Sequence, residues 1–182
     1  MTSLCVGLGN PGQSYENNRH NVGFKFIEYV VNKLTDSQTY ELKLDQKFDA
    51  KILKLKIGDT NYLFAEPQTY MNASGAAIQK MLTYFKIRIE ALTVVHDDLD
   101  IKLGDYKIQM GSGPKQHNGI SSIETSLATK DFKRIRIGIE NRSSDIKISG
   151  EDYVLSNFST QEFSILMEDV FPKIDHTLSF LS

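Results

Sequence analysis

The chain has 182 residues, of which 40% are apolar and 24% are charged, with one cysteine and a net charge of −2. This amount of apolar material suffices for the core of one domain, 1–182, and no stretch approaches the roughly 20 apolar residues that a membrane span needs. A single cysteine excludes an internal disulfide, and the N-terminal residues lack the basic region and long apolar run of a signal peptide. We therefore expect a cytoplasmic protein that contacts no membrane.

Strands and helices are predicted to alternate along the chain. Apolar or alternating runs predict strands at 4–8, 48–55, 61–66, 92–96, 106–110 and 132–139. Helical spacing of apolar residues predicts helices at 22–34, 74–85 and 119–128, and a last helix that begins after Ser159 and bends at Pro172. This order predicts an α/β sandwich with a mostly parallel sheet.

Two polar residues are predicted to lie at one edge of that sheet. Asn10 follows the first strand, and Asp97 comes directly after the apolar run 92–96, so we expect it to end that strand. In such sheets, ligands gather beyond the carboxyl ends of the strands. The functional site is therefore expected at this edge.

The segment 7–23 combines a glycine-rich turn with polar side chains and reads GLGNPGQSYENNRHNVG. Its first letters match the G-x-G-x-x-G fingerprint of dinucleotide sites, which requires a helix that begins within the glycine turn. Here Pro11 and the polar residues up to His20 delay the helix, and no clean second strand ending in an acid follows about 20 residues later. A nicotinamide or flavin enzyme is kept as an alternative, but we expect no cofactor.

His20 is the candidate general base. A lone histidine is more often structural, but this one lies beside the glycine turn and next to Arg19, and an acid is available at Asp97. A carboxylate that holds a histidine stabilises the imidazolium that forms when the ring accepts a proton. The chain has no serine in a G-x-S-x-G turn, so we expect water to be the nucleophile and Asp97 to orient His20.

The stretch HDDLD at 96–100 raises the possibility of a metal site, because it holds one histidine and three acids. Alternation along a strand points His96 and Asp97 to opposite faces, and no second cluster of ligand residues is positioned by the sequence to complete a site. We therefore expect no bound metal. A metal-dependent hydrolase or phosphotransferase is the alternative, and chelation separates the two.

Three asparagines in predicted turns or helix starts can hold a peptide: Asn10, Asn72 and Asn118. Each one alone is commonly a turn former or a helix cap. Together, their neutral amides can hold a peptide backbone, position a water molecule or donate hydrogen bonds to a developing oxyanion.

Four motifs occur in a fixed order: GLGNPG, TYMNASG at 69–75, HDDLD, and HNG at 117–119. Together they resemble the bacterial peptidyl-tRNA hydrolase family, whose members cut the ester that joins a peptide to tRNA. The likeness runs from the first strand to about residue 158. It implies a central mixed, mostly parallel, twisted sheet with helices on both faces, in a metal-free monomer with no obligatory protein partner. The implied substrate is peptidyl-tRNA.

The resemblance also implies roles for single residues. The matches to the catalytic pair and to the asparagines that hold substrate are His20, Asp97, Asn10, Asn72 and Asn118. The matches around the peptidyl and ester groups are Tyr15, Tyr70 and Met71. Arg136 matches an arginine that is implicated in holding a tRNA phosphate.

The chain departs from the family pattern near this phosphate contact. The loop before HNG reads GSGPKQ where the family has small residues, and Gln109 aligns with a lysine that contacts phosphate. Lys107 lies two residues earlier, on the same face of the predicted strand. We expect Lys107 to take over this contact beside Arg136, with Lys115 as the second candidate.

Charge is unevenly distributed along the chain. Residues 101–150 carry nine basic and five acidic side chains, whereas 151–182 carry one and six. A basic block can give one positive face for phosphates, although a solvated loop region would give the same count. A non-catalytic tRNA-binding relative is the alternative from another class, and the intact His20 and Asp97 pair argues against it.

Overall fold

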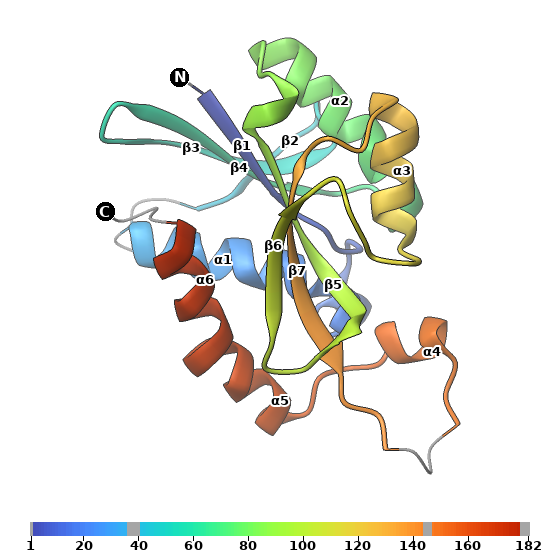
Figure 1. The fold of residues 1–182 in the computed structure, drawn as a ribbon. Coiled ribbons are helices and arrows are strands. Elements are labelled where there is room, and N and C mark those ends of the chain that lie inside the picture. The colour runs from blue at the N-terminus through green and yellow to red at the C-terminus, as the bar shows by residue number, and fades with distance from the viewer. Residues whose placement is uncertain (1, 36–40, 144–146, 179–182) are drawn as a thin grey trace.

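The computed structural model describes residues 2–35, 41–143 and 147–178, and a seven-stranded sheet forms its centre (Figure 1). The strands are β1 Thr2–Gly7, β2 Lys43–Asp45, β3 Ala50–Ile57, β4 Thr60–Pro67, β5 Leu92–Lys102, β6 Tyr106–Met110 and β7 Lys133–Glu140. They stand in the order β2-β3-β4-β1-β5-β7-β6. Four central strands, β4, β1, β5 and β7, run parallel to one another. The outer strands β2, β3 and β6 pair antiparallel with their neighbours. The predicted mixed sheet is confirmed, and its central strands are parallel.

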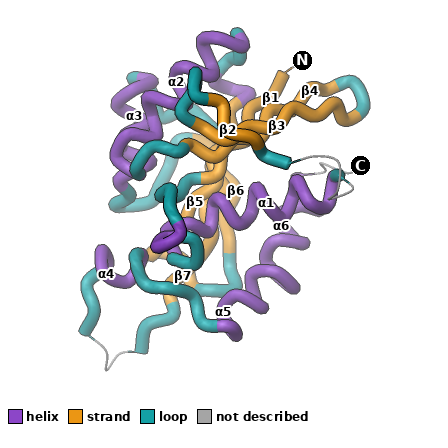
Figure 2. Tube along the Cα trace, turned by 180° about the vertical axis from the view of Figure 1, so that it is seen from behind, coloured by secondary structure: helices purple, strands orange, loops and turns teal. Residues whose placement is uncertain are grey.

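Helices cover both faces of the sheet (Figures 1 and 2). They are α1 Val22–Leu34, α2 Ser74–Phe85, α3 Asn118–Leu127, α4 Gly150–Val154, α5 Thr160–Ile165 and α6 Phe171–Leu178. One apolar core lies beneath α2 and α3, and the other lies beneath α1 and α6. Alternation along β1 explains the pair of cores, because Leu4 and Val6 join the first and Cys5 joins the second.

The C-terminal helical segment is interrupted, in agreement with the prediction at Pro172. A capping box between Ser159 and Glu162 begins α5, which confirms the predicted cap. A π-helical stretch, Leu166–Val170, separates α5 from α6 immediately before Pro172. Because proline lacks a backbone N–H and its ring clashes with the preceding turn, the regular α-helical hydrogen-bond ladder does not pass through this point.

β5 is longer than the sequence pattern predicts, so the expectation that Asp97 ends this strand is wrong. The strand continues to Lys102, and Asp97 pairs with Ile137 of β7 inside it. The polar residues remain in the strand because their side chains have buried partners: two histidines bond to Asp97, and Arg136 bonds to Asp98.

Two short elements were not predicted. β2 has three residues and α4 has five, which is too short for a hydrophobic period to be recognised. Neither changes the architecture, but α4 forms part of the site described below. Of the helices in the described ranges, none is long and apolar enough to cross a membrane.

Candidate active site

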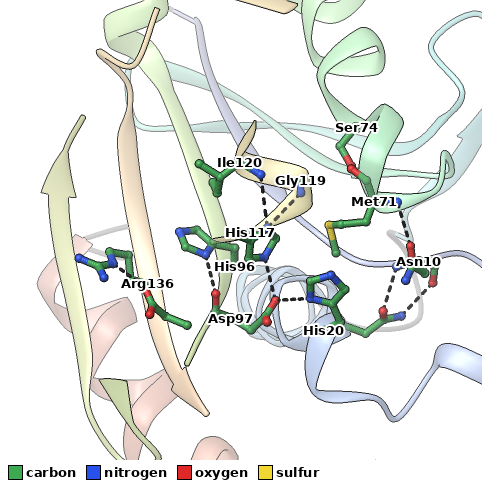
Figure 3. Close-up of polar contacts among 12 residues, drawn as sticks. Asn10, His20, Met71, Ser74, His96, Asp97, His117, Gly119, Ile120 and Arg136 are labelled. Carbon is green, nitrogen blue, oxygen red and sulfur yellow. Dashed lines mark hydrogen bonds and ion pairs between the residues drawn. The ribbon is translucent and has the colours of Figure 1, made fainter. Parts of the chain in front are cut away.

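A buried carboxylate between two histidines forms the centre of the candidate site (Figure 3). Asp97 lies on β5, His20 lies on the short turn Arg19–Asn21 that precedes α1, and His117 lies directly before α3. One oxygen, Oδ1 of Asp97, is 2.8 Å from Nδ1 of His20 and 2.9 Å from Nε2 of His117. All three residues are buried.

Backbone contacts fix the proton positions in this cluster. Nδ1 of His117 accepts hydrogen bonds from the N–H groups of Gly119 and Ile120, at 3.1 and 3.3 Å, and thereby caps α3. The proton of the His117 ring must then be on Nε2, which donates it to Asp97. His20 donates from Nδ1 to the same carboxylate. Within the described part of the chain, Nε2 of His20 makes no hydrogen bond, so it is the nitrogen that can accept a proton.

The charges in the cluster depend on one another. Burial alone would raise the pKa of Asp97, but the neighbouring His20 and His117 and their hydrogen bonds hold that pKa well below its usual value. Burial alone would lower the pKa of His20, but the charge of Asp97 and its hydrogen bond raise the pKa above the ordinary value. Asp97 is therefore a carboxylate at neutral pH, and it makes His20 a stronger base than a free histidine.

Asn10 is held by a reciprocal contact with Asn21. Its backbone N–H donates to Oδ1 of Asn21, and its backbone oxygen accepts from Nδ2 of Asn21, both at 2.9 Å. The side-chain oxygen of Asn10 accepts from the N–H of Met71 at 2.8 Å. The side-chain N–H groups of Asn10 are thus the ones that can reach a substrate. Asn21 precedes α1 but makes no side-chain cap, because its amide is used here.

The glycines of the first motif allow α1 to pack directly on the end of β1. A Cβ on Gly7 would lie 2.2 Å from the oxygen of Gly23, and a Cβ on Gly23 would lie 2.4 Å from the nitrogen of Leu8. α1 itself begins only at Val22. The glycines therefore serve a close approach between chain segments, and the helix start that a dinucleotide fingerprint requires is missing from this turn.

The histidine cluster opens on a cavity of about 590 Å³. The side chains that carry its chemistry are Asn10, His20, Met71, Asp97, His117 and Asn118. Glu151 and Val154 of α4 form part of another wall. The structure thus brings five predicted site residues to one cavity, and it adds His117, whose only signal in the sequence was the HNG motif at a helix start.

Three other predicted residues lie next to Met71 or the glycine turn but do not line this cavity: Tyr15, Tyr70 and Asn72. The ring of Tyr15 meets that of Tyr70 edge-on, with 6.3 Å between the centroids. Tyr70 is 60% exposed, and Asn72 is also exposed. Their positions suit contacts with an extended ligand that leaves the cavity and runs over the surface.

The predicted phosphate ligands lie on β6 and β7, away from the cavity lining. Arg136 is buried and donates from Nε to Oδ2 of Asp98 at 2.6 Å. Lys107 is exposed and stands directly opposite Arg136 in the strand register, whereas Gln109 stands opposite Arg134. Residues opposite each other in a sheet share a face. The structure thus pairs Lys107 with Arg136.

His96 is buried, and its ring lies edge-on against that of His117, with 4.9 Å between the centroids. Its Nδ1 donates to the backbone oxygen of Asp97 at 2.7 Å. Burial lowers its pKa well below the usual value, so the ring is neutral. His96 therefore supports the strand and contributes no charge to the cavity.

Among the described residues, the structure brings together one group of possible metal ligands that the spacing of residues in the sequence does not indicate. The ligand atoms of His20, Asp97 and His117 all lie within 4.8 Å of one another. Both histidine nitrogens that face the carboxylate carry protons in the hydrogen-bond pattern above. A cation bound between the three would have to displace both protons.

Known proteins resemble this chain in both sequence and structure. A family model described as peptidyl-tRNA hydrolase matches residues 4–182. The peptidyl-tRNA hydrolase of Phytoplasma mali is 39% identical over 175 residues, covering 96% of this chain and 95% of that protein. The one from Lawsonia intracellularis is 42% identical over 180 residues, covering 99% and 87%.

Two solved structures share the fold. The crystal structure of peptidyl-tRNA hydrolase from Acinetobacter baumannii matches with a TM-score of 0.80 and 36% identity, covering 98% of this chain and 85% of that one. A complex of peptidyl-tRNA hydrolase with N-propanol matches with a TM-score of 0.81 and 32% identity, covering 98% and 89%.

Proposed function

The chain belongs to the peptidyl-tRNA hydrolase family, and from this premise we propose that it cuts the ester between peptide and tRNA with a water molecule activated by His20. The enzyme is a hydrolase, and its substrate class is peptidyl-tRNA. The observation that carries the proposed mechanism is the hydrogen bond from Nδ1 of His20 to the buried carboxylate of Asp97, which leaves Nε2 available at the cavity.

The proposed reaction proceeds by two proton transfers at His20. Nε2 takes a proton from water as the water oxygen attacks the ester carbonyl carbon, and Asp97 stabilises the imidazolium that forms. When the bond from this carbon to the ribose oxygen breaks, the imidazolium returns the proton to that oxygen. The products are a tRNA with a free hydroxyl and a free peptide with a carboxylic acid end, which ionises by releasing its proton to solvent.

Neutral amides around the histidine hold the substrate in this proposal. Asn118 begins α3 at the cavity and can donate to the developing oxyanion or hold the water. Asn10 offers its N–H groups to the ester and the adjoining peptide. Asn72 and Met71, with Tyr15 and Tyr70, contact the emerging peptide.

The tRNA body is proposed to meet the outer strands, where Lys107 and Arg136 stand opposite each other. Lys107 is exposed and can reach a phosphate directly. Arg136 is engaged by Asp98, so it contributes the remaining N–H groups of its guanidinium. We further propose that the enzyme works in the cytoplasm as a metal-free monomer that needs no protein partner.

A turnover assay with N-acetyl-aminoacyl-tRNA tests this function. The purified protein should release free tRNA and N-acetyl amino acid in the presence of chelator. A protein that binds this substrate but does not cleave it would instead be the non-catalytic tRNA-binding relative.

A further inference from the structure

A second cavity lies on the other side of the turn that carries Asn10. Its volume is about 350 Å³, and it is enclosed by the turn after β1, by α1 and by strands β3 and β4. Asn10 lines both this cavity and the cavity at the histidine cluster. The second cavity is therefore separated from the proposed ester position by a single residue. The mechanism above does not use it.

Glu66 of β4 lines this cavity and is 1% exposed. Among the residues that the structure describes, its Oε1 has no hydrogen-bond partner. Lys51 stands opposite Glu66 in the register of β3 and β4, and its charge acts on Glu66, although no ion pair within 4.0 Å joins the two among the described residues. A buried carboxyl oxygen without a partner is costly, and it marks a position where a donor from outside the chain would be stabilised.

The lysines around the cavity compensate this carboxyl group only in part. Lys25 lies between two carboxylates, 3.4 Å from Glu28 and 3.8 Å from Glu16. Counting Lys51 and Glu66, the wall holds three acids and two lysines. Burial, and then the charge of Glu28, raise the pKa of Glu66 to about 8 against the smaller opposing effects of Lys51 and Lys25. An arriving cation would favour the ionised form of this group and complete the charge balance.

We propose that the second cavity receives a cationic side chain, arginine or lysine, from the peptide close to its ester end, and that Glu66 is the counter-ion. The inference rests on the proposed function, because Asn10 would hold the ester end of that peptide. A cavity of this volume accommodates one long side chain. The enzyme would therefore release peptides with a basic residue near the stalled end faster than neutral ones.

The test compares substrates that differ in one charge. A single tRNA is chemically acylated with N-acetyl-peptides that end in phenylalanine and carry either arginine or its neutral isostere citrulline, at the penultimate or the preceding position. We expect kcat/KM of the wild-type enzyme to be about tenfold higher for arginine at one of the two positions, as one charge-assisted hydrogen bond implies. Glu66→Gln should reduce this ratio to about one. The exposed control Glu90→Gln should keep it.

The outcomes separate this inference from the function on which it rests. Equal turnover of arginine and citrulline substrates by the wild-type enzyme, at both positions, overturns the subsite without any variant. An arginine preference that survives Glu66→Gln also overturns the assignment of Glu66. Failure to cleave any of these substrates would instead contradict the proposed function.

Discussion

Arg19 and His20 are adjacent in sequence, but their side chains belong to two different buried networks. Both terminal nitrogens of Arg19 are bonded: one donates to Ser156 and to the backbone of Asn157, and the other to both oxygens of Glu162. The guanidinium also lies 4.2 Å from the ring centroid of Tyr153. This network ties the segment before α5 to the turn that carries His20.

The His20 network also consists of buried, ion-paired side chains, but one of its nitrogen atoms makes no hydrogen bond among the described residues. A buried acid, Asp97, binds His20 and His117, and one nitrogen of His20 is left at a cavity. In the Arg19 network the terminal donors all bind groups of the protein, as a structural anchor requires. The comparison teaches that burial and ion pairing do not mark a catalytic group, whereas a spare proton site at the end of a buried relay does.

The substitution His20→Ala tests most directly whether the His20 network is catalytic. We expect turnover to fall by roughly 10² to 10⁴, the usual contribution of one positioned general base, while tRNA binding stays close to wild type and the variant still folds. The measurements are single-turnover hydrolysis of N-acetyl-aminoacyl-tRNA and denaturant unfolding. The exposed His176→Ala is the matched control. Near-normal turnover of His20→Ala would remove His20 from the mechanism.

Asp97→Asn should lower turnover by about 10²-fold, because His20 remains but loses the charge that stabilises its imidazolium. Asp97 raises the pKa of His20 against the effect of burial, so the pKa should fall in the variant. A general base works in its neutral form. The rate should therefore rise with pH through the His20 pKa, and this limb should move to lower pH in Asp97→Asn. An unchanged NMR titration midpoint for His20 would contradict the contact.

In the Arg19 network, Glu162→Ala should affect stability more than chemistry. The side chains of Arg19 and Glu162 are only 8% and 10% exposed, and removing one partner of a buried pair typically costs about 3 kcal/mol. We expect a loss of this size in urea unfolding, with kcat of the folded enzyme changed only a few-fold. Glu168→Ala, exposed on the same helical segment, is the control. Normal stability together with lost turnover would reverse the roles of the two networks.

Arg136 is a second buried arginine paired with an acid, so it can be compared with Arg19. If Arg136, like Arg19, serves only as a structural anchor through its bond to an acid, the contact with tRNA depends on Lys107, which stands opposite it. Lys107→Ala should then weaken tRNA binding and reduce the slope of log affinity against log salt by about 0.9, the value of one phosphate contact. Lys56→Ala, on the opposite part of the sheet, should leave the slope unchanged. A wild-type slope for Lys107→Ala combined with a reduced one for Lys115→Ala would place the contact in the loop before His117.

The smallest expected effect is that of chelation. The two histidines donate protons to Asp97, so the His20 network should work without a cation. Exhaustive dialysis against EDTA should leave kcat unchanged. Activity that disappears and returns with added zinc or manganese would show that these three residues form a metal centre.

The sequence predicted the alternation of strands and helices because apolar periodicity is a local property. It could not predict the true length of β5, since the polar residues after His96 remain in the strand only through partners distant in sequence. His117 was missed for the same reason, because its role depends on a carboxylate twenty residues away. The prediction pairs His20 with Asp97 from the glycine turn, the predicted sheet edge and the family resemblance, because spacing alone cannot pair two residues across 77 positions.

The cap formed by His117 restricts which side chains can serve at this position. The side chain must accept two hydrogen bonds at the start of α3 and donate one to Asp97 from its opposite end. Serine, threonine and aspartate cap helices well, but they are too short to do both tasks. Replacing His117 by any of them would keep the helix and disconnect it from the carboxylate. Position 117 therefore has to meet two structural requirements, the cap of α3 and the hydrogen bond to Asp97, and a single imidazole satisfies both.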